Sequence, residues 1–412
     1  MLHRNVEPMR HKWRHLGLLM LAELMAMSLW FSASAVVPQL TLAWGLDRGQ
    51  QSWLTMPVQV GFVVGALASA WLNLADRIPA HRLIAAGAGI GALANAAIVF
   101  ADGPGWVVPL RFLTGAILAA VYPLGMKVIA SWTSRDRGLG IGLLVGALAI
   151  GSASPHLING LPVHGGGLEL PPWKPVLLTA SASALIGAMI VLWFVREGPL
   201  LRPASRFNWR YALTSFSERP TRLANFGYLG HMWELYAMWS WVPLMLLASY
   251  ARAGWGETEG RLAGFAVIAV GGVGSALAGK LADRWGRTAT ASLSLAVSGA
   301  CCLVAGAMFK SPGLLTAVCL IWGFAVVADS AQFSAAVSEL TDSSHVGTAL
   351  TMQTCAGFLL TLLTIRLTPV LVDWLGWEWG FVFLAAGPVV GIASMLRLRS
   401  LPDATRMASG NR

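Results

Sequence analysis

Two acidic residues lie within apolar segments, where a charged side chain is unexpected. Glu23 belongs to the run LGLLMLAELMAMSLWFSASAVVP, and Glu234 begins the segment ELYAMWSW. Both segments fit the pattern E-L-x-A-M-x-x-W, and the two glutamates are 211 positions apart in a chain of 412 residues. An ionisable group in hydrocarbon is costly and is a functional candidate by default, because it can bind and release a proton as its surroundings change. We therefore predict that Glu23 and Glu234 are proton-coupling residues.

Helical spacing places other chemically useful side chains beside each glutamate. Residues spaced by three or four positions share one face of a helix. Each copy then has a face with a carboxylate, a thioether and an indole, which suits a cavity better than lipid. The residues are Glu23, Met27, Trp30 and Ser34 in the first copy and His231, Glu234, Met238 and Trp241 in the second. We predict that Trp30, His231 and Trp241 contact a bound solute. Because two ligands do not make a metal site, no metal is expected at His231 and Glu234.

Arg111 and Asp329 are two further charges inside apolar segments. A buried guanidinium needs carboxylate or carbonyl partners. Arg111 is therefore predicted to bind an anionic solute or to control the pKa of a neighbouring carboxylate, and a structural ion pair is the alternative. Asp329 begins a polar run with Ser330, Gln332 and Ser334. This run predicts a cavity wall in which Asp329 binds a proton and Gln332 contacts the solute. The alternative for Asp329 is a side chain that reaches back to the membrane surface.

The elements that must position these residues are membrane-spanning helices. The chain is 56% hydrophobic and 12% charged, whereas a soluble chain carries about 25% charged residues. Apolar runs of about 20 residues, the length of a helix that crosses a bilayer, recur from end to end. We therefore predict an all-α membrane protein with twelve transmembrane helices. The predicted spans are 16–38, 52–74, 83–100, 105–131, 138–160, 174–195, 223–249, 260–281, 288–308, 312–338, 346–370 and 377–397.

The net charge of +10 is explained by membrane topology, and no nucleic-acid partner is expected. With the N-terminus in the cytoplasm, most lysines and arginines fall on the predicted inner segments, as the positive-inside rule requires. An even number of spans then puts both termini in the cytoplasm of a multi-pass protein of the inner membrane. The basic segments are expected to contact anionic lipid. The four cysteines all fall inside spans, which argues against a disulfide framework.

A hydrophilic segment near the middle of the chain separates six predicted spans from six. This segment, 196–222, carries six arginines and two glutamates and is interpreted as a cytoplasmic linker. The predicted domains are therefore an N-terminal half at 1–195 and a C-terminal half at 223–412.

The two halves are predicted to be repeats of one unit. Asp76 and Asp283 are 207 positions apart, and Gly115 and Gly323 are 208 positions apart, close to the separation of the glutamate pair. Repeats of six spans are parallel, and they give two pseudo-symmetric six-helix halves. In transporters built this way, substrate sites lie near the membrane midplane between the halves.

Short motifs in both halves resemble those of the major facilitator superfamily, over nearly the whole chain. The segment GKLADRWGR (279–287) is similar to the superfamily's loop motif, which follows the second span of a half. The segment LNLADRIPAHR (72–82) is a weaker copy, in which Leu72 and Pro79 stand where glycines are usual. The segment RFLTGAILAA (111–120) resembles the superfamily's R-x-x-x-G motif in the fourth span.

The resemblance implies the twelve-helix fold of the superfamily and a gating role for the two loops. In the superfamily these loops hold the cytoplasmic ends of the helices together in one state. The residues that would do so here are Asp76, Arg77, Asp283, Arg284 and Arg287. Charge-assisted bonds between aspartate and arginine can supply such a latch.

Two later segments are loosely similar to bacterial permeases grouped with nitrate/nitrite and cyanate carriers. They are GHMWELYAMWSWVP (230–243) and ADSAQFSA (328–335). The nitrate carriers have one arginine in the second span and another in the eighth. The predicted span 52–74 lacks one, so nitrate is not carried over as the substrate. In the fifth span, Ala147 replaces the proline of the antiporter motif G-x-x-x-G-P, which favours uptake over antiport.

These features predict a secondary active transporter that moves a small solute across the cytoplasmic membrane by alternating access. Proton-coupled uptake of an organic or inorganic anion is the main hypothesis. Proton-coupled efflux of an amphipathic or cationic compound is the alternative, and a non-transporting sensor or a membrane-embedded enzyme is more remote. The sequence has no G-x-x-x-x-G-K-[ST] loop, and no cofactor is expected. The expected partners are the small-molecule solute, protons and lipid, and the protein is expected to work as a monomer.

Overall fold

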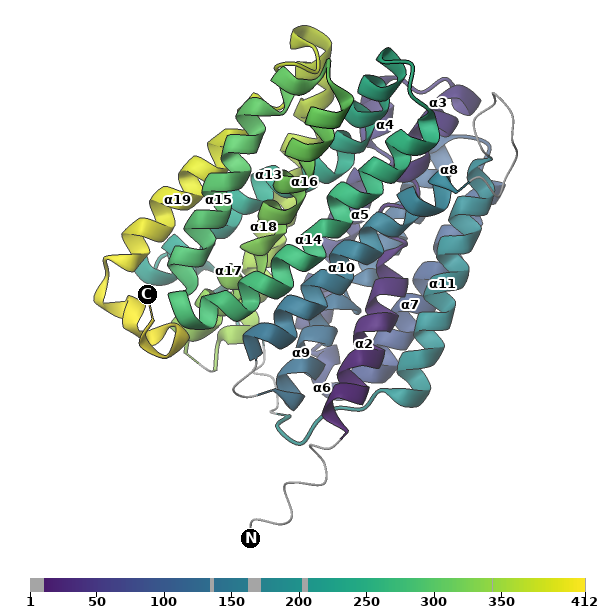
Figure 1. Cartoon of the computed structure of the whole chain (residues 1–412). Helices are drawn as coiled ribbons and strands as arrows, with labels where there is room; N and C mark the ends of the chain where they lie inside the picture. The colour runs from purple at the N-terminus through teal and green to yellow at the C-terminus, as the bar shows by residue number, and fades with distance from the viewer. Residues whose placement is uncertain (1–10, 134–136, 162–171, 202–206, 343, 412) are drawn as a thin grey trace.

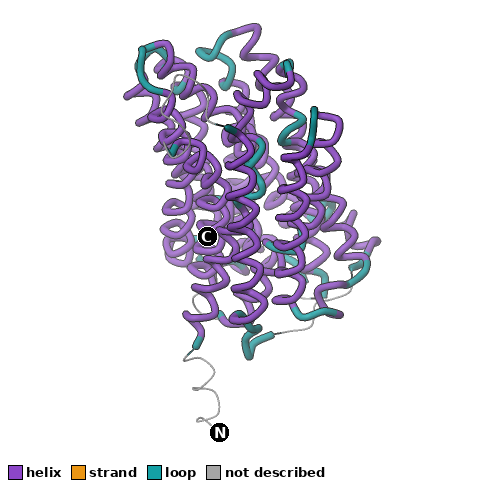
Figure 2. Tube along the Cα trace, turned by 90° about the vertical axis from the view of Figure 1, so that its right-hand side faces the viewer, coloured by secondary structure: helices purple, strands orange, loops and turns teal. Residues whose placement is uncertain are grey.

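Long helices packed side by side form the computed structural model of the chain (Figures 1 and 2). The structure describes residues 11–133, 137–161, 172–201, 207–342 and 344–411. Within these ranges all regular structure is helical, because a helix satisfies its own backbone hydrogen bonds where lipid offers no partners. The predicted all-α class is confirmed.

The N-terminal half contains the helices of the first six predicted spans. Their bounds are α2 Lys12–Met27, α3 Val37–Trp44, α4 Arg48–Ser52, α5 Met56–Trp71, α6 Leu74–Arg77, α7 Ala80–Ala97, α8 Pro104–Leu118, α9 Tyr122–Trp132, α10 Arg137–Gly160 and α11 Trp173–Phe194. A short helix, α12 Trp209–Thr214, lies in the predicted linker.

The C-terminal half contains the helices of the last six predicted spans. Their bounds are α13 Arg219–Arg252, α14 Glu257–Trp285, α15 Arg287–Val304, α16 Pro312–Ala328, α17 Ser330–Leu340, α18 Val346–Leu375 and α19 Ala386–Arg399. Two 3-10 turns, Pro402–Arg406 and Ala408–Gly410, follow α19.

In the described part of the chain, ten helices are long and apolar enough to cross a membrane. They correspond to ten of the predicted spans. The other two spans, 16–38 and 223–249, correspond to α2 with α3 and to α13. The helices therefore match the twelve predicted spans one for one.

In the described part of the chain, three spans are interrupted well inside their length. The first span turns irregularly between Met27 and Ser34, the fourth is broken at 119–121 between α8 and α9, and the tenth is broken at Asp329 between α16 and α17. The last two breaks fall at corresponding positions, because Val121 and Asp329 are 208 residues apart. Irregular backbone at membrane depth is tolerated only where protein or a cavity covers it, so these breaks point to the interior of the bundle.

The repeat also appears in the packing of the two halves. A Cβ atom on Gly115 of α8 would collide with the carbonyl oxygen of Val58 in α5. In the other half, a Cβ on Gly323 of α16 would collide with the carbonyl oxygen of Val267 in α14. The same glycine in each half thus lets the second and fourth helices touch backbone to backbone.

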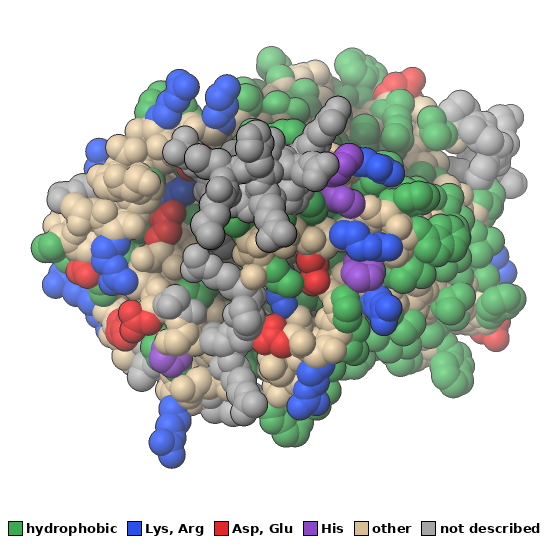
Figure 3. Space-filling model, turned by 90° about the horizontal axis from the view of Figure 1, so that it is seen from below, with side chains coloured by type: hydrophobic (Ala, Val, Ile, Leu, Met, Phe, Trp, Pro, Cys, Tyr) green, Lys and Arg blue, Asp and Glu red, His purple; other side chains and the backbone are tan. Residues whose placement is uncertain are grey.

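The bundle has two end faces. The terminal face, at the bottom of Figure 1, is where α2 begins and α11 ends, and the opposite far face carries α3 and α4. Charged side chains of both signs and histidines gather on the terminal face (Figure 3). The two halves meet along α10 and α14 and along α5 and α18.

Candidate functional site

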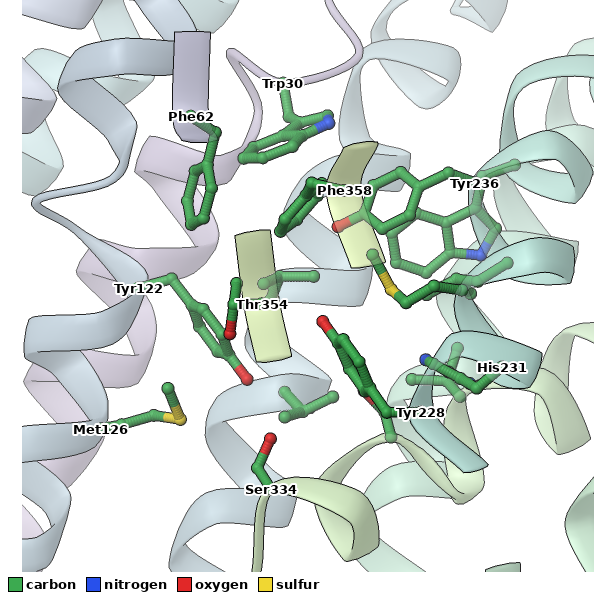
Figure 4. A pocket seen from close by; sticks show the side chains of 17 residues that line it. Trp30, Phe62, Tyr122, Met126, Tyr228, His231, Tyr236, Ser334, Thr354 and Phe358 are labelled. Carbon is green, nitrogen blue, oxygen red and sulfur yellow. The ribbon is translucent and has the colours of Figure 1, made fainter. Parts of the chain in front are cut away.

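A cavity of about 50 Å³ lies between the two halves, at the level of the broken helices (Figure 4). Its wall is made by Trp30 and by side chains of α5, α9 and α10 from one half, and by side chains of α13, α16, α17 and α18 from the other. A space of this size holds a few water molecules. A larger solute therefore enters only when the side chains around the cavity move apart.

Four aromatic rings close the cavity on the side of the far face. Phe62 and Phe358 are 4.6 Å apart between ring centroids, and Trp30 lies 5.2 Å from Phe62 and 5.3 Å from Phe358. Tyr236 adds a contact of 5.1 Å to Phe358. Because Trp30 and Phe62 belong to one half and Tyr236 and Phe358 to the other, this aromatic cluster joins the halves.

Hydroxyl groups line the part of the cavity nearer the terminal face. Tyr122 and Tyr228 approach from opposite halves and point their hydroxyl groups into the space between them (Figure 4). Ser334 and Thr354 also line the cavity. The cavity thus combines flat apolar walls with donors and acceptors at one end.

His231 is the basic side chain among the residues that line the cavity. Its Nδ1 lies 2.8 Å from Oδ1 of Asp329, and both side chains are 1% exposed. Asp329 sits at the break between α16 and α17, where its carboxylate makes no capping bond to the helix and faces the imidazole instead. The Nε2 atom of His231 has no partner in the described structure, so it is available to a ligand.

Two indoles on the cavity wall also have unused donors. Nε1 of Trp30 and Nε1 of Trp239 are buried and have no hydrogen-bond partner in the described part of the chain. Buried donors normally find a partner. The two indoles belong to opposite halves and offer N–H groups to an anionic or carbonyl oxygen, and Nε2 of His231 does so when it carries a proton.

Glu234 lies behind the cavity wall, on the side of α13 that packs against α15 and α16. Its Oε2 accepts a hydrogen bond from Ser298 Oγ at 2.9 Å, and its Oε1 accepts bonds from Trp322 Nε1 at 2.5 Å and Cys302 Sγ at 3.2 Å. The side chain is fully buried. Its carboxylate is therefore held by three donors of its own half, away from the lining residues.

Glu23 is also buried but has a different environment. Neither carboxylate oxygen has a hydrogen-bond partner in the described structure. A Cβ on Gly125 of α9 would lie 2.5 Å from Glu23 Oε2, so the carboxylate rests against this glycine. Gly125 is one turn from Tyr122, which places Glu23 directly behind the cavity wall.

Arg111 is bound to the backbone at the break in the first span. Its guanidinium donates to the carbonyl oxygens of Leu54 at 3.1 Å, Leu29 at 2.8 Å and Trp30. It also bonds Ser32 and Asn95 at 3.2 and 3.4 Å. It is fully buried and is not among the lining residues. The predicted solute contact of Arg111 is therefore not present at this cavity, and its partners in the described structure are carbonyls, a serine and an asparagine rather than a carboxylate.

Gln332 and Trp241 were expected to contact the solute, but the structure places both outside the cavity lining. Gln332 Oε1 accepts a bond from Arg287 Nη1 at 3.3 Å, and Trp241 Nε1 donates to the carbonyl of Ile365 at 3.0 Å. Each is therefore occupied by another part of the C-terminal half. Trp30 and His231, the other two expected contacts, do line the cavity.

The expected cavity faces of both first helices need correction. Helix α2 ends at Met27, so the helical spacing that joined Glu23 to Ser34 is lost, and Ser34 bonds Thr55 instead at 2.5 Å. Helix α13 continues, but it turns a neighbouring side to the cavity, and of the expected face only His231 lines it.

The residues that sequence reasoning missed on α13 are Tyr228, Tyr236 and Trp239. Together with His231 they follow helical spacing, so their periodicity was visible in the sequence. The side of α13 that carries the buried carboxylate of Glu234 is not the side that lines the cavity. No helical spacing of polar or aromatic residues in the sequence indicated Phe62 or Phe358.

The predicted gating residues form separate clusters on the terminal side. Arg287 lies 3.0 Å from Asp283 Oδ1 and bonds Glu339 Oε1 at 3.1 Å. The Asp283 carboxylate rests against Gly138 of α10, in the other half. This part of the second loop therefore lies at the contact between the halves.

The first loop is held within its own half. Lys127 Nζ lies 3.1 Å from Asp76 Oδ1 and also bonds the carbonyl of Ala75 at 2.5 Å. Arg77 and Arg284 are exposed. The structure thus brings Asp283 and Arg287 together, whereas Arg284 is not part of that cluster.

Comparison with known proteins settles the family. The family model described as Major Facilitator Superfamily matches residues 19–328 and 226–411. The chain belongs to the Major Facilitator Superfamily. It is therefore a multi-pass membrane transporter and not an enzyme, and the resemblance found in its loop motifs is confirmed.

Relatives within the superfamily are transporters named for small aromatic acids. A gallate transporter of Pseudomonas putida is 25% identical over 321 residues, which cover 70% of each chain. The 4-hydroxybenzoate transporter PcaK of Pseudomonas aeruginosa is 26% identical over 165 residues, which cover 39% of this chain and 35% of the relative. The niacin transporter NiaP of Acinetobacter baylyi is 28% identical over 144 residues, 31% of this chain and 32% of the relative.

Proposed function

We propose that this superfamily member takes up small aromatic carboxylates together with protons, by alternating access through the cavity between its halves. The observation that carries the proposal is the composition of the cavity wall. Aromatic rings from both halves surround a space whose basic side chain is His231. The names of the relatives, which refer to gallate, 4-hydroxybenzoate and niacin, point to the same class of solute.

The aromatic walls explain why the solute would be a ring compound. Trp30, Phe62 and Phe358 contact one another at stacking or tilted distances. A flat solute that separates them replaces ring–ring contacts with ring–solute contacts of similar geometry. The hydroxyls of Tyr122 and Tyr228 would bond polar substituents on the solute ring.

The unused donors explain why the solute would be an anion. A carboxylate in this cavity could accept bonds from the indoles of Trp30 and Trp239 and, when His231 is protonated, from its Nε2 atom; these three atoms are unpartnered in the described structure. Protonation of His231 would add a charge-assisted bond. The proton and the anion would then enter the membrane as a neutral pair, which avoids the cost of an unpaired buried charge.

Three buried carboxyl groups remain the proposed proton-coupling residues, namely Glu23, Glu234 and Asp329. Asp329 is the one in contact with a residue of the cavity lining, because it lies 2.8 Å from His231. We therefore place Asp329 with His231 at the centre of proton coupling. Glu23 and Glu234 lie one layer behind the wall.

The proposal includes an orientation and a gate. The terminal face would lie in the cytoplasm of the inner membrane, where its basic side chains agree with the positive-inside rule. Asp283, Arg287 and Asp76 would help to hold the terminal ends of the helices in one state, with Arg77 and Arg284 as exposed participants. One chain would be sufficient for transport, since the cavity is built within a single chain.

The test is uptake of radiolabelled 4-hydroxybenzoate into proteoliposomes with an imposed pH gradient. Accumulation against a concentration gradient, lost on addition of a protonophore, is the expected result. Nitrate, cyanate and a hydrophobic cation serve as competing solutes that should not inhibit. No accumulation of any aromatic acid would refute the proposal, and transport of the cation instead would favour the efflux hypothesis.

His231→Gln provides the residue-level test, with His345→Gln as the control. His345 lies outside the cavity, stacked on Tyr211. The cavity variant should lose at least about tenfold in uptake, the effect of removing one strong bond to a charged ligand. The control variant should transport like the wild type. Equal behaviour of the two variants would remove His231 from the mechanism.

A further inference from the structure

The outer end of the contact between the halves contains a second group of basic side chains. Arg261 lies in the second turn of α14 and is only 4% exposed. His156 lies near the end of α10 and is 6% exposed. Both belong to the far face, and neither lines the central cavity. The predicted span 260–281 includes Arg261, which is not among the predicted site residues.

Arg261 belongs to the C-terminal half and contacts the N-terminal half. Its Cβ lies 3.3 Å from the position that a Cβ on Gly160 would take, and its Nη1 is 3.4 Å from the carbonyl oxygen of Asn159. Asn159 is held in turn by its own half, through a bond from Gln39 at 2.7 Å and a bond to the carbonyl of Ala35 at 2.7 Å. The arginine therefore presses against a rigid part of the N-terminal half.

The guanidinium is poorly satisfied for a buried cation. Its bond to Asn159 is long, and its Nε has no partner in the part of the chain that the structure describes. Its carboxylate partner there is Glu257, at 2.7 Å, whose side chain is 58% exposed. A carboxylate ligand could offer two short parallel bonds to such a group, which a single distant carbonyl cannot.

His156 adds a second unsatisfied donor beside the first. It shares one face of α10 with Asn159 and Gly160, three and four positions away. Its Nε2 is buried and unpartnered among the described residues. Two basic groups on opposite halves therefore face the same seam, so the ligand that suits them is an anion.

Arg261 and His156 lie between the far face and the cavity. Leu148 of α10 lines the cavity, and His156 is eight residues further along the same helix, a rise of about 12 Å. Arg261 contacts α10 at Asn159 and Gly160, about one turn further out. An anion that moves along the seam of α10 and α14 would meet Arg261 first, then His156, and then the cavity.

We propose that Arg261 and His156 form an outer binding station for the carboxylate of the incoming solute. With the halves closed at the far face, Arg261 bonds the Asn159 carbonyl. When the halves separate there, the guanidinium leaves this carbonyl and binds the carboxylate, which it passes towards the cavity. This inference rests on the proposed function for the class of anion.

The test compares an anion with a neutral molecule of nearly the same shape. The protein reconstituted in proteoliposomes transports labelled 4-hydroxybenzoate, and unlabelled 4-hydroxybenzoate or 4-hydroxybenzamide is added as inhibitor on the far-face side. Arg261→Gln should weaken inhibition by the carboxylate about tenfold, the loss expected for one charge-assisted contact. Inhibition by the amide should be unchanged.

The controls separate a binding role from a structural one. Arg252→Gln removes an exposed arginine at the end of α13 and should leave both inhibitors unchanged. If Arg261 only holds the halves together, Arg261→Gln will alter inhibition by acid and amide equally, which would overturn the inference. If that variant does not reach the membrane, Arg261→Lys and His156→Gln carry the same test, with the same selective loss for the acid.

Transport and inhibition of the wild-type protein distinguish failure of the proposed function from failure of the outer station. If the wild type neither transports nor is inhibited by 4-hydroxybenzoate, the proposed function fails and the outer station fails with it. If the wild type transports the acid and the Arg261 variants keep the ratio of acid to amide inhibition, only the outer station is refuted.

Discussion

The two copies of the E-L-x-A-M-x-x-W segment have nearly the same sequence and very different surroundings. Glu234 accepts hydrogen bonds from Ser298, Cys302 and Trp322. Glu23 is equally buried, but its oxygens have no donor among the described residues. Two identical side chains in one repeated fold therefore have different chemistry, because the neighbouring helices supply the donors.

The neighbouring positions show where the difference arises. At the offset of 207 that relates the two loop motifs, Ser298 and Cys302 of the C-terminal half correspond to Gly91 and Asn95. Gly91 has no side chain to donate, and Asn95 bonds Ser32 and Leu177 instead. Two of the three donors that hold Glu234 are thus missing from the first half or serve another purpose there.

The first half is held together by a buried arginine, Arg111, rather than by a buried carboxylate such as Glu234. Its first helix ends at Met27, and the carbonyls freed by this break accept bonds from Arg111. The second half has Cys319 at the corresponding position, 208 residues later, and its first helix α13 runs unbroken. One half is therefore fixed by a cation that donates to backbone, and the other by an anion that accepts from side chains.

The largest expected effect is that of Arg111→Met. The change leaves the carbonyls of Leu29, Trp30 and Leu54 buried without this donor, at about 1–3 kcal/mol for each unsatisfied group. We expect loss of more than about 3 kcal/mol of stability, seen as a large fall in Tm or as failure to accumulate folded protein. Cys319→Ala at the corresponding position is the control and should cost about 1 kcal/mol. Equal effects would show that Arg111 does not anchor the first half.

Glu234→Gln and Glu23→Gln provide the second test. The amide group of a glutamine turns one acceptor of residue 234 into a donor, which then faces the donors Ser298, Cys302 and Trp322. This should lower stability by about 2 kcal/mol. At residue 23 no donor is lost or opposed, and the change should stay below about 1 kcal/mol. Thermal unfolding in detergent measures both, and a larger loss at residue 23 would contradict the comparison.

The same pair of variants reports on proton coupling. If either carboxyl group carries the transported proton, its glutamine variant will exchange solute down a gradient but will not accumulate it. Accumulation by the Glu234→Gln protein would remove Glu234 from the proton-coupling residues. The same result for Glu23→Gln would remove Glu23.

The smallest effect concerns the space around Glu23. In Gly125→Ala the new Cβ would lie 2.5 Å from Glu23 Oε2, so the carboxylate must move, at a cost of about 1–2 kcal/mol. Truncation of the carboxylate in Glu23→Ala should abolish this cost, because the two groups are in contact. A double-mutant cycle on thermal stability measures the coupling. Additive effects would mean that Glu23 does not rest on Gly125.

The sequence by itself determined the class of the protein and its plan. Apolar runs of membrane-spanning length give the helices and their order, because a bilayer fixes how long an apolar helix must be. The spacing of the repeated motifs gives two halves. The match of the twelve spans and the family comparison agree with both. Of the predicted solute contacts, Trp30 and His231 line the cavity, and His231 lies beside Asp329 as the charges suggested.

Tertiary structure decided which side of each helix faces the cavity and which charges are satisfied. In a membrane helix all faces are apolar, so periodicity identifies the solvent side far less clearly than in a soluble protein. The break after Met27 and the donors around Glu234 depend on contacts with helices far away in the chain. For this reason the sequence could name Glu234 and Arg111 as buried charges, but only the packing shows that each is already bound within its own half.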